Sequence, residues 1–171
     1  MHDGSMLKRI LHSIDSFSSW TGRITSVLIF GMLAVLLYEI FARYLFNAPT
    51  IWAHETSAFI FGTYFMLASA YVLSIKGHVS IDIVYGRLSV RAQAILDILT
   101  FIFFLLMCIT LIWHGGSVAL DAWRMGETSQ SIWGPPLYPI RTMIPIGATL
   151  LLIQGIAKFV RDLNIAVRKE P

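Results

Sequence analysis

Four long apolar stretches constrain the fold of this chain more than any other feature of its sequence. They lie at about 23–46, 52–75, 92–114 and 140–160. A bilayer hydrocarbon core about 30 Å thick needs about 20 apolar residues in a helix, and each stretch approaches or reaches that length. The mean hydropathy is +0.70 and 13% of the residues are charged, against about a quarter in soluble domains. The sequence therefore predicts an all-α integral membrane protein with four transmembrane helices in one membrane domain.

Basic residues at the ends of these stretches predict the orientation, because Lys and Arg are retained on the cytoplasmic side of a membrane. The N-terminal segment, the 76–91 loop and the C-terminal tail together hold ten of them, and the other side holds Arg43, Arg124 and Arg141. We therefore expect a multi-pass inner-membrane protein with both termini in the cytoplasm and with phospholipids around it. The aromatic residues expected at the outer interface are Tyr44, Trp52, Trp113, Trp123, Trp133 and Tyr138.

The segment before the first apolar stretch has apolar residues at helical spacing. They are Leu7, Ile10, Leu11, Ile14 and Phe17, with polar and charged residues between them. This pattern predicts an amphipathic helix at about 6–20 that lies flat on the inner leaflet. The alternative is that the segment extends the first transmembrane helix into the cytoplasm.

Four ionisable residues lie within or beside the apolar stretches, where a charge is costly. Glu39 and Arg43 are four residues apart on one helical face, and Glu55 begins the next stretch after a short hairpin. We expect these three side chains to converge and neutralise one another, either as a structural cluster, as a contact to a partner subunit, or as part of an ion path. Asp97 lies one to two turns inside the third stretch, where we expect Arg91 or a partner subunit to pair with it.

Histidines raise the possibility of a bound cofactor or metal. His54 and His114 are expected at the same face, and facing histidines ligate haem in some membrane cytochromes. Both lie at helix ends, however, where an interfacial histidine is the ordinary interpretation. His78 and Asp82 lie in the 76–91 loop with too few further ligands for a closed metal site. We therefore expect no cofactor and no metal.

Motifs for soluble-type catalysis are absent from the sequence, which has no phosphate-binding loop, nucleophile elbow or zinc motif. Its basic residues flank apolar runs, so we expect no nucleic acid as a partner and no enzyme activity. Cys108 lies inside an apolar run and is expected to pack there. Ala58 and Gly62 form a small-xxx-small pair that favours close approach of another helix.

Two motifs carry a resemblance to a known family. Residues 39–55 read EIFARYLFNAPTIWAHE and residues 77–82 read GHVSID. Both resemble the small membrane subunit of tripartite ATP-independent periplasmic (TRAP) transporters, the DctQ family. The resemblance extends from about 20 to 162 in length, number of spans and motif order, although His54 stands where the family often has an acidic residue. Within these motifs Asn47, Trp52, His78 and Asp82 join the candidate structural or partner-contact residues.

The resemblance implies a role in a sodium-coupled importer of three parts. These are a periplasmic solute-binding protein, a large membrane subunit of the DctM type, and this small permease subunit. In that family the large subunit holds the substrate and sodium sites, and the small subunit packs on its fixed scaffold. The implied process is secondary active uptake of an organic acid or a related solute.

Two other functions remain open from the residues alone. The first is a self-sufficient homo-oligomeric transporter or channel with Glu39 as its coupling carboxylate. The second is a haem-bearing membrane anchor of an oxidoreductase. Reconstitution of the chain alone tests the first, and a haem absorption band tests the second.

Overall fold

The computed structural model describes residues 3–75 and 90–167, and four α-helices account for most of them. Their bounds are Asp3–Leu45 for α1, Ala53–Ser74 for α2, Val90–Met125 for α4 and Tyr138–Val167 for α5. All four helices are long and apolar enough to cross a membrane, which confirms the predicted all-α membrane fold. α4 continues eleven residues beyond the predicted end at about 114, because no proline lies between Trp113 and Met125 and the helix tolerates Gly115 and Gly116.

The N-terminal segment differs from the separate interfacial helix expected at about 6–20. α1 is one continuous helix of 43 residues, so this segment is the first part of α1, as the alternative interpretation held. Hydroxyl groups along it bond within the helix: Ser13 donates to the carbonyl of Arg9 at 3.0 Å and Thr21 to that of Phe17 at 3.0 Å. With no proline in the segment, nothing interrupts the backbone hydrogen bonds between its amphipathic and apolar parts.

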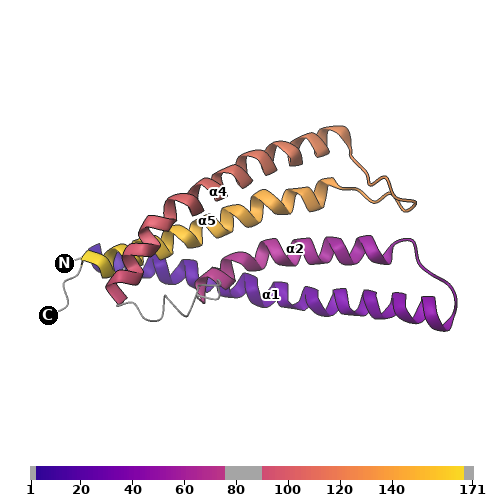
Figure 1. Cartoon of the computed structure of the whole chain (residues 1–171), viewed down its shortest axis with the longest axis horizontal. Helices are drawn as coiled ribbons and strands as arrows, with labels where there is room; N and C mark the ends of the chain where they lie inside the picture. The colour runs from indigo at the N-terminus through magenta and orange to yellow at the C-terminus, as the bar shows by residue number, and fades with distance from the viewer. Residues whose placement is uncertain (1–2, 76–89, 168–171) are drawn as a thin grey trace.

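The helices form two antiparallel hairpins, α1 with α2 and α4 with α5, and the hairpins meet mainly where α2 packs against α5 (Figure 1). One end of the bundle, the terminal end, holds the start of α1 and the end of α5. The opposite end, the loop end, holds the loops 46–52 and 126–137. In Figure 1 the hairpins lie close together at the terminal end and separate toward the loop end.

Glycines let neighbouring helices approach closely. A Cβ atom at Gly22 of α1 would lie 2.3 Å from the Tyr71 ring of α2, and one at Gly147 of α5 would lie 2.6 Å from the Met66 carbonyl oxygen. At Gly155 of α5 it would lie 2.2 Å from the ring of Phe104. Side chains at these three positions would push the helices apart, as is typical of helix contacts in membranes.

Two further predictions about packing have different outcomes. Cys108 is fully buried in a cluster with Leu73 and Leu151, as expected. Of the predicted small-residue pair, Gly62 contacts Ile140 of α5, whose Cδ1 would be 3.4 Å from an added Cβ. Ala58 is exposed, so only one member of the pair serves a contact within the chain.

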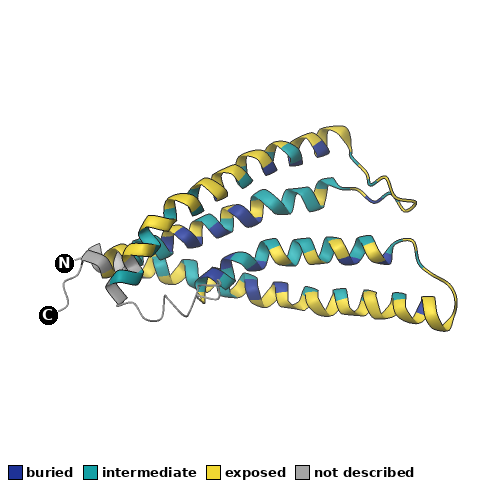
Figure 2. Cartoon of the chain, viewed as in Figure 1, coloured by how far each residue is buried: buried dark blue, intermediate teal, exposed yellow. Residues whose placement is uncertain are grey.

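α1 uses a narrow stripe of its surface to contact the rest of the bundle (Figure 2). We call this surface the inner stripe. Its residues follow one another in alternating steps of three and four, and none of them is exposed. They are Leu11, Ile14, Ser18, Thr21, Thr25, Leu28, Met32, Val35, Glu39 and Ala42. Between residues 23 and 41, every residue of α1 outside the inner stripe is exposed. This 3.5-residue repeat is typical of left-handed helix packing.

Candidate functional site

Glu39 and Arg43 form an ion pair at the loop end, as their spacing predicts. Arg43 donates through Nε to Glu39 Oε1 at 2.9 Å. The second carboxylate oxygen accepts a hydrogen bond from the backbone nitrogen of Thr50 at 3.0 Å and another from its hydroxyl group. The Glu39 side chain is 14% exposed and that of Arg43 is 53% exposed. The carboxylate therefore fastens the loop 46–52 to α1, and the outward side of the guanidinium is open.

Asn47 and Trp52 shape the same loop. Asn47 has a positive φ of 48°, a conformation that asparagine tolerates better than most residues. It lets the chain reverse after α1, with the backbone nitrogen of Ala48 donating to the Ala42 carbonyl at 2.9 Å. Trp52 stacks on Tyr38 with ring centroids 5.7 Å apart. Both residues thus have a structural role within the α1–α2 hairpin.

Glu55 does not join the Glu39–Arg43 pair, which corrects the prediction that the three side chains converge. Its carboxylate instead accepts hydrogen bonds from the hydroxyl groups of Ser129 and Ser131, the latter at 2.6 Å. The reason is geometric: Glu55 lies in the first turn of α2 on the side that faces the α4–α5 loop. Glu55 therefore links the two hairpins across the loop end.

The α4–α5 loop is held by contacts of its own. Arg141 of α5 binds both carboxylate oxygens of Glu127, at 2.6 and 2.5 Å. Backbone bonds cross the loop from Ser129 to Pro135 at 2.8 Å and from Leu137 to Glu127 at 2.9 Å. The loop thus has a defined shape with Ile132, which is 90% exposed, at its tip.

Asp97 pairs with Lys158 of α5, whereas the sequence suggested Arg91 or a partner subunit. Lys158 donates to Asp97 and also contacts Asp162 Oδ2 at 3.1 Å. The three side chains are between 15% and 32% exposed. Lys158 was expected in the cytoplasmic tail, but α5 runs on past it, and the antiparallel course of α4 and α5 places it opposite Asp97. A lysine shared by two carboxylates therefore joins α4 to α5 at the terminal end.

A second polar network joins α1 to α5 near the same end. The amide of Gln154 donates to Asp15 at 2.8 Å and accepts from the Ser18 hydroxyl at 3.0 Å. Arg161 also donates to Asp15, at 2.7 Å. Gln154 is 1% exposed and Ser18 is 4% exposed, so the network includes a buried amide with both of its ends bonded.

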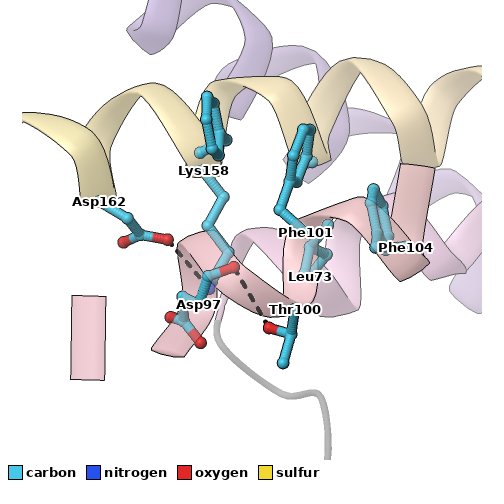
Figure 3. A pocket seen from close by; sticks show the side chains of 9 residues that line it. Leu73, Asp97, Thr100, Phe101, Phe104, Lys158 and Asp162 are labelled. Atoms are coloured by element: carbon cyan, nitrogen blue, oxygen red, sulfur yellow. Dashed lines mark hydrogen bonds and ion pairs between the residues drawn. The ribbon is translucent and has the colours of Figure 1, made fainter. Parts of the chain in front are cut away.

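A cavity lies beside Lys158 (Figure 3). Its volume is about 110 Å³, and its apolar lining includes three phenylalanines and Leu73 of α2. Asp97, Lys158 and Asp162 stand at its side and bond to one another. The space is about that of a few water molecules or part of a lipid chain, and is smaller than the 300–1,000 Å³ of most small-molecule sites.

His54 and His114 do not form a metal site in the described part of the chain. His54 and His114 are both exposed, on α2 and α4 respectively. Residues 3–75 and 90–167 contain no group of three or more histidine, cysteine or acidic side chains that could hold a metal ion. His78 and Asp82 lie outside the described residues.

Several residues of these networks were not identified from the sequence. They are Asp15, Ser18, Glu127, Ser129, Ser131, Gln154, Asp162 and Arg161. A partial signal existed for α5, because Gln154, Lys158 and Asp162 recur at four-residue spacing and therefore share one face of that helix. The polar residues of α1 and of the α4–α5 loop carry no comparable pattern.

The fold and its polar contacts define a class: a multi-pass α-helical membrane protein whose internal charges join its helices and loops. Comparison with known proteins gives the family. The model of the DctQ component of tripartite ATP-independent periplasmic transporters matches residues 32–164. This is more than half of the chain, so the chain belongs to the DctQ family.

Two curated relatives are each 28% identical to this chain. One is the isethionate TRAP transporter permease protein DctMQ of Oleidesulfovibrio alaskensis, over 78% of this chain and 23% of the relative. The other is the sialic acid TRAP transporter small permease protein SiaQ of Vibrio cholerae, over 52% of this chain and 47% of the relative. The similarity thus spans about a quarter and about half of these two proteins.

Proposed function

We propose that this chain is the small permease subunit of a sodium-coupled TRAP transporter in a bacterial inner membrane. The observation that carries the proposal is the DctQ match over residues 32–164, which includes all of α2 and α4, α5 except for its last three residues, and most of the apolar part of α1. The proposed partners are a large DctM-type membrane subunit and a periplasmic solute-binding protein.

Within that transporter we assign the chain a supporting role. Sites for small molecules are concave, with a few convergent polar groups, whereas the polar side chains of this chain bond mainly to one another at the two ends of the bundle. Transporter helices that hold a substrate are commonly broken near mid-membrane, and the described helices are continuous. The solute would then be chosen by the partners.

The test is uptake in cells and in proteoliposomes. Deletion of this chain is expected to abolish uptake while the solute-binding protein still binds its solute. Replacement by a related small subunit that still assembles is expected to restore uptake of the original solute. A changed substrate profile after the exchange would contradict the supporting role, and uptake without the chain would contradict the function.

We also propose that the terminal end faces the cytoplasm, because ten basic residues flank that side against three on the other. Single cysteines at exposed positions test this in a Cys108→Ser background. An impermeant thiol reagent should label Ile132→Cys in intact cells and should not label Ser16→Cys or Asn164→Cys. The reverse labelling pattern would invert the orientation.

A further inference from the structure

A second stripe on α1, one residue away from the inner stripe, is exposed along its whole length. We call it the outer stripe, and its residues also follow one another in alternating steps of three and four. They are Ile10, Ser13, Phe17, Trp20, Ile24, Val27, Gly31, Ala34, Tyr38 and Phe41. Its large apolar members are 48–65% exposed; they are Ile10, Phe17, Trp20, Ile24, Val27, Tyr38 and Phe41. The outer stripe therefore has the 3.5-residue repeat of a helix-packing surface, and no described helix of this chain covers it.

The outer stripe is too long to be explained by lipid. From Ile10 to Phe41 it covers about 47 Å at 1.5 Å per residue, whereas the hydrocarbon core is about 30 Å thick. A helix would have to tilt by about 50° to keep the stripe inside, beyond the observed range of about 0–40°. On α4, by contrast, the exposed positions that repeat at the same spacing run from Leu96 to Leu120, about 36 Å, and the next position of that series is the charged Arg124.

The neighbouring residues of α1 show where the bilayer ends. Next to the outer stripe lie Arg9, His12, Ser16 and Arg23, all exposed. Such side chains belong in the headgroup layer or in water. Past this level the outer stripe still carries the exposed apolar residues Ile10, Phe17 and Trp20, and the rings of Phe17 and Trp20 are stacked with their centroids 6.3 Å apart. Its polar member there, Ser13, donates its hydroxyl group to the Arg9 carbonyl within the helix. An apolar surface that continues beyond the bilayer fits a protein partner, since lipid chains do not reach it.

The middle of the outer stripe is shaped for close approach. Gly31 and Ala34 are both exposed, and a Cβ atom at Gly31 would meet nothing within 4 Å. A glycine in an exposed helix interior lowers helix stability relative to alanine, and a small residue lets a partner helix come near. The small residues lie between Val27 and Tyr38, so the larger side chains flank the point of contact.

We propose that the outer stripe binds a helix of the large permease subunit, one that crosses the bilayer and continues past its terminal-end surface. This inference rests on the proposed function. A second copy of this chain fits less well as the partner. In a symmetric parallel pair, each helix uses the residues on both sides of its contact line, so both sides must be free. One side here is the inner stripe, which packs against the rest of the bundle.

Photo-crosslinking of the co-expressed transporter tests the contact directly. Phe17 and Val27 of the outer stripe, and Phe103 of α4 as a control, are replaced one at a time by p-benzoylphenylalanine. Adducts with the large subunit are expected from positions 17 and 27 and not from 103. An adduct of about 38 kDa, twice the 19.2 kDa of this chain, would overturn the proposal in favour of self-association. Absence of any protein adduct at 17 and 27 would overturn it in favour of lipid.

A matched pair of glycine substitutions gives an independent measurement. Gly31 on α1 and Gly116 on α4 both have open space where a Cβ would lie, so at either position a side chain starts away from the other helices of this chain. Gly31→Trp is expected to reduce copurification of the large subunit about tenfold, because its indole ring would overpack the contact with the partner helix. Gly116→Trp is expected to leave it unchanged. Equal behaviour of the two variants would overturn the assignment, and copurification with the unaltered chain tests the proposed function separately.

Discussion

The two ends of the bundle are held together in different ways. At the terminal end, side chains of α5 bond to α1 and to α4 through the Asp15 and Lys158 networks. At the loop end, Glu39 with Arg43 and Glu127 with Arg141 each act within one hairpin. The polar contacts that the structure gives between hairpins there are those from Ser129 and Ser131 to Glu55. The difference indicates that the terminal end fixes the arrangement of the helices, whereas the loop end mainly shapes its own loops.

Removal of Lys158 is expected to have the largest effect on stability. Lys158→Ala takes away the cation shared by Asp97 and Asp162. Breaking a buried pair costs about 3–5 kcal/mol; we expect about 2 kcal/mol here, because the side chains are partly exposed and both carboxylates keep further contacts. Unfolding of the purified chain in mixed micelles measures the loss. Arg124→Ala is the control, since the ion pair between Arg124 and Asp121 is 3.8 Å long and exposed. Equal losses of unfolding free energy in the two variants would show that the partly buried ion pair contributes no more than the exposed one.

Gln154 gives the next largest effect. Gln154→Leu keeps the volume but leaves the buried Ser18 hydroxyl without its acceptor, which costs about 1–2 kcal/mol. The double variant with Ser18→Ala should recover part of this loss, because two apolar partners no longer carry an unsatisfied group. The same unfolding assay gives both values. Additive losses in the double variant would show that the two side chains are not coupled.

Glu55→Ala should loosen the loop end without unfolding the protein. Spin labels at positions 51 and 132, on the two loops, report their separation by electron paramagnetic resonance. We expect a broader distance distribution in the variant, because the hydroxyl groups of Ser129 and Ser131 lose their common acceptor. Labels at positions 13 and 164, at the terminal end, should be unaffected. Broadening at both ends would mean that Glu55 supports the whole bundle.

Arg43→Ala is expected to have the smallest effect. Arg43 is 53% exposed, and Glu39 keeps both hydrogen bonds from Thr50. Exposed ion pairs four residues apart on a helix contribute little, so we expect a fall in melting temperature of about 1–2 °C. Glu39→Ala should lower it more, since it also releases Thr50. If Arg43→Ala instead matched Lys158→Ala, the two ends of the bundle would be held equally.

The number of membrane helices and the contacts that depend on local spacing follow from the sequence alone. Apolar length gave all four helices, and the four-residue spacing of Glu39 and Arg43 gave their ion pair, because helix geometry alone brings such residues together. The sequence also left open the course of the N-terminal segment, which the structure shows as part of α1.

Which distant polar groups meet depends on how the helices pack, and the sequence does not show this. Asp97 and Lys158 are 61 residues apart, and Glu55 and Ser129 are 74 apart. Such pairs depend on how each helix is rotated and shifted against its neighbours. Apolar helices leave that choice open, because many of their faces are equally hydrophobic. The close approaches at Gly22, Gly147 and Gly155 select one arrangement, because only certain rotations bring a glycine opposite a large neighbour.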